Sequence, residues 1–157
     1  MGFVCTIEEK LDVHVMQKGS ACIAAVAIGY DDEDDLNYSV VAGVEEVPGE
    51  TEFYFAIVEA NNNNGQEYFY FDGKYTTSFI SKPDRELILS VILAASECVI
   101  SQAQPKRFFR CCYEPDLPDK ALAKHNLLTK VFEGCGYHIV RTDPYHHGKR
   151  IWVMERA

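Results

Sequence analysis

The chain has 157 residues and a net charge of −9. This is the length of one ordinary domain, long enough to bury about two thirds of its unfolded surface. The charge is divided, because residues 1–72 hold 15 acidic and 2 basic side chains whereas residues 73–157 hold 9 acidic and 13 basic ones. The acidic N-terminal half disfavours nucleic acid and anionic membranes as partners, and its charge fits either a basic protein partner or solubility alone. The sequence shows neither a basic leader with an apolar segment nor an uninterrupted apolar span, so we expect a cytoplasmic protein.

The first 50 residues form an acidic part that is rich in strand-like segments. Residues 20–30 and 38–47 have the β-branched and small apolar residues typical of strands, and residues 7–18 fit either a strand or a short helix. An exposed run of carboxylates joins the two strands. A calcium loop would need a glycine inside this run and a glutamate in place of Ala42. The carboxylates that we expect to contact a basic partner are Asp31, Asp32, Asp34 and Asp35.

Turn signals divide the next segment into three predicted strands. Asn64-Gly65 lies between two aromatic and β-branched runs, and Asp72-Gly73 repeats the pattern further along the chain. Both dipeptides adopt the positive φ angles of a tight hairpin turn. The sequence therefore predicts an antiparallel meander with strands at 52–60, 66–71 and 74–80.

A change of period predicts a long helix after the meander. Apolar residues recur at three- and four-residue spacing between residues 83 and 104, which gives the helix a broad buried face. Ser81 is placed to cap the N-terminus, and Pro83 suits the first turn because its missing N–H has no helical partner there.

The remaining segments alternate strands with one more helix. Residues 106–113 are typical of a strand, and a second helix is predicted from about residue 118 to residue 133. Gly134 is placed to end this helix in a left-handed conformation. A final hairpin is predicted over residues 136–155.

The tip of the final hairpin contains two adjacent histidines. Pro144 and Gly148 are turn residues between two strand-like runs, which places the tip near residues 143–148. His146 and His147 then lie in an exposed turn, where we expect solvated side chains and not metal ligands.

The cysteines give no disulfide or metal pattern. The six cysteines lie mostly inside apolar segments of a chain large enough to have its own core, so we expect reduced thiols. Cys111 and Cys112 are neighbours in a predicted strand, whose successive side chains point to opposite faces. Cys135 and His138 have a spacing found in zinc sites, but no second pair accompanies them. We therefore predict no metal site.

The predicted order from residue 52 is three strands, a helix, a strand, a helix and a hairpin. This order resembles the C-terminal two thirds of the GNAT N-acetyltransferase superfamily over about 100 residues. VFEGCGYHIVR at 131–141 is similar to the family's Leu-Tyr-Glu-Lys-x-Gly-Phe motif and the strand after it, and WVMER at 152–156 is similar to its final strand. The expected fold is one α+β domain over residues 1–157, with a mostly antiparallel sheet, two main helices and additional strands before residue 52.

The resemblance also implies where a cofactor would bind. The family holds the pyrophosphate of acetyl-CoA on backbone N–H groups of a glycine-rich loop that opens the helix after the third meander strand. The corresponding segment here, TTSFISKPDREL, has no glycine, and Asp84 and Glu86 add negative charge. Ser81, Lys82 and Arg85 remain as the residues that would contact a CoA ester. We expect no cofactor, and acetyl-CoA only if the protein is an enzyme.

The catalytic position of the family is also altered. The resemblance places Phe132 where the family commonly has a tyrosine that protonates the leaving thiolate, and a phenylalanine has no proton to donate. His125 occupies the position of a family asparagine. Tyr113 and Tyr137 retain hydroxyl groups nearby in sequence. If the protein is an enzyme, His125 or Tyr137 would handle the proton.

Two functions follow from these observations. The absence of both family motifs favours a GNAT-like domain that acts as a non-catalytic binding or inhibitory module through its acidic surface. In a narrower version, the carboxylates imitate a nucleic-acid backbone and occupy the basic groove of a protein. The alternative is an atypical acyl-CoA-dependent N-acetyltransferase.

Overall fold

Nine strands form one mixed sheet in the computed structural model, which describes residues 2–71, 73, 75–112 and 119–157. The strand order is β1-β3-β4-β5-β7-β9-β8, with β2 also paired to β3 and β6 also paired to β5. The strands are β1 Phe3–Cys5, β2 His14–Lys18, β3 Ala21–Asp31, β4 Leu36–Val47, β5 Glu50–Asn61, β6 Glu67–Tyr70, β7 Arg107–Cys112, β8 Tyr137–His146 and β9 Lys149–Arg156. The helices are α1 Lys82–Ala103 and α2 Asp119–Gly134. The fold is therefore α+β with a mostly antiparallel sheet, as predicted.

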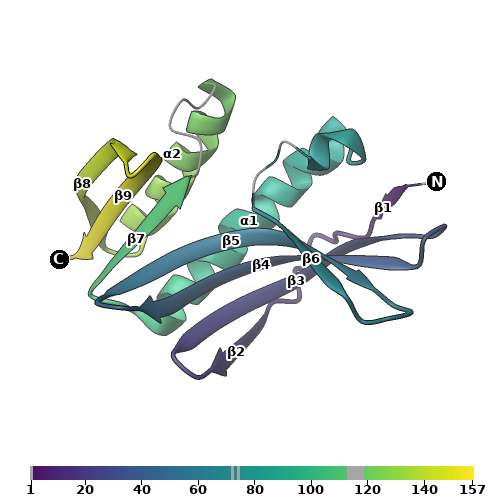
Figure 1. Ribbon diagram of the computed structural model, residues 1–157, viewed down its shortest axis with the longest axis horizontal. Helices are drawn as coiled ribbons and strands as arrows, with labels where there is room; N and C mark the ends of the chain where they lie inside the picture. Colours follow the sequence, from purple (N-terminus) through teal and green to yellow (C-terminus); the bar gives the residue numbers. More distant parts are fainter. Residues whose placement is uncertain (1, 72, 74, 113–118) are drawn as a thin grey trace.

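The helices and the sheet enclose a common apolar core. Helix α1 packs on β3 and β4, and α2 contacts α1 and β8. Figure 1 shows β7, β9, β8 and α2 on the left of the molecule, and the long strands β3, β4 and β5 on the right with α1 behind them. Alternate residues of β3 and β4 enter this core, which is the period-2 pattern of a sheet with one face covered. They are Cys22, Ala24, Val26 and Ile28 in β3 and Tyr38, Val40, Ala42 and Val44 in β4.

Strands β3, β4 and β5 make the long antiparallel meander of the sheet. The strands predicted at 20–30, 38–47 and 52–60 are confirmed, with β4 and β5 paired along their whole length. Strand β1 lies against Gly29 of β3, where an added Cβ would lie 2.4 Å from the Val4 carbonyl oxygen. Only glycine fits this close approach of two backbones.

The prediction of a third meander strand at 74–80 is wrong. Thr76–Ser78 form a 3-10 turn, η1, in place of a strand. The Thr76 hydroxyl donates to the Gly73 carbonyl oxygen at 3.1 Å, and the Ile80 N–H donates to the Thr76 carbonyl oxygen at 2.9 Å. These turn hydrogen bonds bury Ile80 and lead the chain directly into α1. The antiparallel strands that directly precede α1 are therefore β3, β4, β5 and the short β6.

Helix α1 forms as its sequence predicts. The Ser81 hydroxyl accepts a hydrogen bond from the Asp84 N–H at 3.4 Å, and Pro83 lies in the first turn. Among the described residues, α1 is also the one helix whose length and composition would allow it to cross a membrane. Its apolar character has a structural reason here, because one face packs on the sheet. The buried residues of that face are Ile88, Val91, Ile92, Ala95, Ser96, Val99 and Ile100.

Strands β5 and β7 meet in parallel at one register pair, Glu52 with Phe109. Beside this pair lies an aromatic cluster, in which the Phe132 ring centroid is 4.9 Å from that of Phe53 and 5.0 Å from that of Phe108. All three rings are almost fully buried. Packed side chains therefore join the two parts of the sheet at this point more than backbone hydrogen bonds do.

The end of α2 differs from the prediction that Gly134 adopts a left-handed conformation. Gly134 is the last helical residue, and Gly136 has the positive φ angle, 95°. The Cys135 N–H still donates to the Val131 carbonyl oxygen at 3.2 Å, which extends the helical hydrogen bonding past Gly134. The reversal therefore falls two residues later.

The final hairpin, β8 with β9, is confirmed. His147 and Gly148 form its tip with φ angles of 50° and 79°. His146 ends β8, and Pro144 is accommodated inside β8 because this strand lies at the edge of the sheet.

Five cysteines are free thiols: Cys5, Cys22, Cys98, Cys111 and Cys135. Three predictions fall on residues outside the described part of the chain: the turn at Asp72, the hydroxyl of Tyr113 and the start of the second helix near Pro118. The segment 7–18, left between strand and helix by its sequence, is a strand from His14 onward.

Candidate functional site

The acidic run lies at the tip of the β3–β4 hairpin, where all four predicted partner-binding aspartates come together. The Asp31 carboxylate accepts hydrogen bonds from the N–H groups of Glu33 at 2.9 Å and Asp34 at 3.1 Å. Asp35 has a φ angle of 54°, which an aspartate tolerates better than most residues. Asp31 and Asp35 therefore shape the turn, whereas Asp32 and Asp34 are exposed residues between them.

The asparagine-rich loop between β5 and β6 is attached to this tip. The Asn62 side-chain amide donates to the Asp35 carboxylate at 2.9 Å, and the Asn62 N–H donates to the Asp35 carbonyl oxygen at 3.0 Å. The Asn37 amide donates in turn to the Asn62 side-chain oxygen at 2.6 Å. The acidic tip is thus held against the start of the loop that joins β5 to β6. Sequence reasoning missed this contact because the asparagines were interpreted as a turn alone.

Aromatic side chains are exposed along the strand that follows this loop. The exposed fractions are 57% for Tyr68, 41% for Phe69 and 52% for Phe71. The Phe69 and Phe71 rings stack with centroids 5.9 Å apart. We call residues 31–35 and 67–71 together the acidic–aromatic surface. Aromatic residues beside a charged rim are the composition typical of protein interfaces.

A second acidic group, at residues 45–52, does not extend this surface. It lies at the β4–β5 turn, and β4 runs from Leu36 beside the first group to Val47 beside the second. Nine residues of extended strand, 36–44, lie between the two groups and separate Asp35 from Glu45 by roughly 33 Å. This distance is several Debye lengths at physiological salt, so the two groups act as separate charge clusters.

The residues expected to contact a CoA ester lie together at the start of α1. Ser81 caps the helix, and the Arg85 guanidinium folds back to donate to the Ile80 carbonyl oxygen at 2.6 Å. Lys82 is exposed beside them. The Asp84 N–H and one N–H group of Arg85 thus already donate hydrogen bonds within the protein, to the Ser81 hydroxyl and the Ile80 carbonyl oxygen, that an anion would otherwise accept.

His125 lies against β7 and β9 and not in a solvent-filled site. Its ring stacks on Trp152 with centroids 4.6 Å apart, and its Nδ1 accepts a hydrogen bond from the Arg110 guanidinium at 2.8 Å. Burial, and then the positive charge of Arg110, lower the pKa of His125 to about 3. The imidazole is therefore neutral at physiological pH and already serves as an acceptor, which argues against a role as a general base.

Arg110 is a buried cation that sequence reasoning did not single out. It is 3% exposed and donates to the His125 carbonyl oxygen at 2.9 Å and to the Thr129 hydroxyl at 2.5 Å. Its guanidinium carbon lies 4.3 Å from the Trp152 ring centroid, and its Nε has no hydrogen-bond partner. Burial lowers the pKa of Arg110 to about 9, so the side chain stays charged at neutral pH. No local motif marks such a residue, because its partners lie on α2 and β9.

Tyr137, the other candidate for proton transfer, has a structural hydrogen bond. Its hydroxyl donates to the Pro105 carbonyl oxygen at 2.6 Å, and its ring packs on Phe108. Burial raises the pKa of Tyr137. The Tyr137 side chain joins β8 to the segment before β7. Its partners differ from those of His125, which contacts Arg110 and Trp152.

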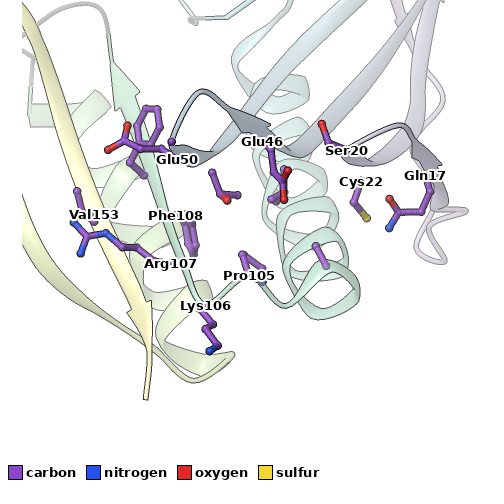
Figure 2. Close-up of a pocket in the computed structure, with 15 residues that line it drawn as sticks. Gln17, Ser20, Cys22, Glu46, Glu50, Pro105, Lys106, Arg107, Phe108 and Val153 are labelled. Carbon is purple, nitrogen blue, oxygen red and sulfur yellow. The ribbon is translucent and has the colours of Figure 1, made fainter.

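A cavity is found at another place, between the β4–β5 turn and the connection from α1 to β7. It has a volume of about 720 Å³ and carries Glu46 and Glu50 from the turn and Lys106 and Arg107 from the connection (Figure 2). Arg107 also forms an ion pair with Glu155 at 2.8 Å. No residue expected from the family resemblance lines this cavity.

Comparisons with protein-family models, with curated proteins and with solved structures find no match for this chain. The function is therefore inferred from the geometry of the acidic–aromatic surface and of the residues expected to bind CoA.

Proposed function

We propose that this protein is a GNAT-like, non-catalytic binding module that holds a basic protein partner on its acidic–aromatic surface. The observation that carries the proposal is the attachment of the acidic tip to the loop between β5 and β6 through Asn62. This loop leads into β6, so five carboxylates and the N-terminal end of the aromatic strand lie at the same end of the sheet. The carboxylates attract a basic partner over long range, and the rings supply apolar contact area at short range.

The order of the elements supports the GNAT-like part of the proposal. The meander β3-β4-β5 is followed by α1, β7, α2 and the β8–β9 hairpin, which is the order used for the resemblance but begins at Ala21 and not at residue 52. Strand β6 and the turn η1 are then an insertion between the third meander strand and α1.

The insertion also weighs against the acyltransferase alternative. Strand β4 pairs with one edge of β5 along its whole length, so β6 and β7 share the other edge. Strand β7 uses that edge at Glu52, and β6 uses it from Ile57 to Ala60. A ligand placed between β5 and β7 would meet β6 on the β5 edge from Ile57 to Ala60, which leaves only residues 53–56 of that edge outside both pairings. Together with the hydrogen bonds of His125 and Tyr137, this arrangement favours binding over acetyl transfer.

The proposal is tested with partners captured from cell extract on the immobilised protein. We expect association to weaken between about 50 and 300 mM salt, since exposed charges are increasingly screened. The double variant Asp32→Asn/Asp34→Asn should slow association about tenfold at low salt. The matched control, Glu46→Gln/Glu50→Gln, removes the same charge at the far end of β4 and should have little effect. A partner that binds equally to both variants at all salt concentrations contradicts the proposal.

A further inference from the structure

We propose that the partner binds as an added β-strand on the free edge of β6. The inference rests on the proposed function and specifies the form of the partner: an extended segment with alternating apolar residues followed by basic residues. In such complexes main-chain hydrogen bonds give affinity, and alternate side chains give specificity.

Strand β6 has one strand neighbour in the described part of the chain, which is β5. Its other edge presents backbone N–H and C=O groups without a strand partner, and such an edge is a template for pairing with another chain. Figure 1 shows β6 projecting with its hairpin on the side of the sheet opposite to β8.

The hydrogen-bond pattern identifies the residues that face the free edge. The Asn61 N–H donates to the Gln66 carbonyl oxygen at 2.8 Å, so Asn61 and Gln66 face each other across the hairpin. Hydrogen-bonded and non-hydrogen-bonded pairs alternate along an antiparallel ladder. Tyr68 and Tyr70 therefore direct their backbone groups to β5, whereas Glu67 and Phe69 direct theirs outward.

The sequence of β6 carries little that would prevent such pairing. Natural edge strands are commonly protected by lysine, proline or bulges. The edge strand β8 has comparable protection, which consists of the basic residue Arg141, the proline Pro144 and two register shifts. Strand β6, with the sequence EYFY, has no basic residue and no proline, and its pairing with β5 is regular.

The charge of the acidic tip determines at which end of the added strand its basic residues lie. The acidic tip and the N-terminal end of β6 lie at the same end of the sheet, because Asn62, which follows β5, binds Asp35, and Asn61 pairs with Gln66 just before β6. Antiparallel pairs are slightly more stable than parallel ones. A segment paired antiparallel to β6 has its C-terminal end at the acidic tip, so its basic residues follow its apolar ones. A second copy of this chain is a poorer occupant, because both copies carry a charge of −9.

The test uses two synthetic peptides of identical composition, TVTVTVKKKK and KKKKTVTVTV, in calorimetric titrations. We expect the first to bind more tightly. Glu67→Pro removes one outward N–H at the first residue of β6, a position where proline is tolerated. Its control, Glu67→Gln, removes the same charge but keeps the N–H. Glu67→Pro should bind TVTVTVKKKK roughly three- to tenfold more weakly than Glu67→Gln, as expected for one hydrogen bond.

Hydrogen exchange of the wild-type protein gives a readout that does not depend on a variant. The Phe69 amide should exchange more slowly when TVTVTVKKKK is bound, because the added strand accepts its hydrogen bond. Equal affinity of both Glu67 variants, or an unchanged Phe69 exchange rate in the peptide complex, overturns strand addition.

The outcomes separate this inference from the proposed function. If peptide binding falls with salt and with Asp32→Asn/Asp34→Asn but Phe69 is not protected, the acidic–aromatic surface binds without strand addition. If neither peptide binds, both proposals fail. Self-association of the protein in sedimentation that Glu67→Pro abolishes would assign the edge to a second copy and also overturn the inference.

Discussion

His125 links the stability of the protein to acid. Burial and the Arg110 charge lower the pKa of His125 from 6.5 to about 3 in the folded protein. Between these two values the unfolded chain binds a proton that the folded protein does not. The contribution of His125 to the free energy of unfolding is therefore retained above pH 6.5 and lost as the pH falls toward 3.

The size of this effect follows from the two pKa values. The pH of 4.5 is about 2 units below the pKa of the imidazole in the unfolded chain, which is therefore protonated, whereas the buried imidazole remains neutral. At about 1.36 kcal/mol per unit, the folded state loses about 2.7 kcal/mol relative to high pH. We expect His125→Gln, whose amide oxygen keeps an acceptor for Arg110, to lose about 2.5 kcal/mol less than the wild type between pH 7 and pH 4.5.

The measurement is urea unfolding at pH 7, 5.5 and 4.5, followed by the fluorescence of Trp152. The control is His138→Gln, which removes an exposed histidine on β8. Equal losses of stability for the wild type and His125→Gln would refute the reasoning and show that the imidazole is protonated in the folded protein.

Three further predictions concern the core, the cofactor and the edge of the sheet. Burial lowers the pKa of Arg110 to about 9, which corresponds to a cost of about 5 kcal/mol to its charged form. Arg110→Met removes this buried charge, so its free energy of unfolding in urea should remain within about 2 kcal/mol of that of the wild type. Arg110→Lys should be less stable than Arg110→Met, and the opposite order would contradict this account. Acetyl-CoA at 1 mM should shift the melting temperature by less than about 1 °C; a larger shift that is lost in Lys82→Ala/Arg85→Ala would favour the enzyme. Gly29→Ala should cost about 1–3 kcal/mol and release β1 from β3, visible in the amide NMR signals near Val4; unchanged signals would show that the two backbones separate without cost.

Local signals in the sequence predicted the local structure well. Ser81 caps α1 because its hydroxyl reaches an N–H three residues away, and the final hairpin turns at His147 and Gly148 as the turn residues indicate. Such features depend on short-range sterics and hydrogen bonds that a sequence displays directly. The segment 74–80 has the same β-branched and aromatic residues as a strand, but it has no strand partner in the structure and a turn buries Ile80. Strand propensity alone cannot distinguish these outcomes, because pairing depends on distant residues.

Only part of the candidate site could be predicted, because the rest depends on contacts between residues that are distant in the sequence. The position of the acidic aspartates between two strands is local information, and the hairpin tip follows from it. The contact of Asp35 with Asn62 and the separation of the second acidic group depend on the pairing of β4 with β5. The Arg110 network joins three elements, and a lone arginine in a strand gives no signal of burial. Its position became visible only when α2 was packed on β7 and β9.

The single register pair between β5 and β7 makes the chain separable at one place. Other contacts across that line in the described part of the chain include the aromatic cluster of Phe53, Phe108 and Phe132 and the packing of α1 against α2. The connection that crosses it begins at Gln104, which ends α1 in a left-handed conformation. A chain cut after Gln104 would leave two fragments, each with its own hairpin and helix. We expect these fragments to reassociate when mixed, so the two parts of the protein could serve as a split reporter that is rebuilt by aromatic packing.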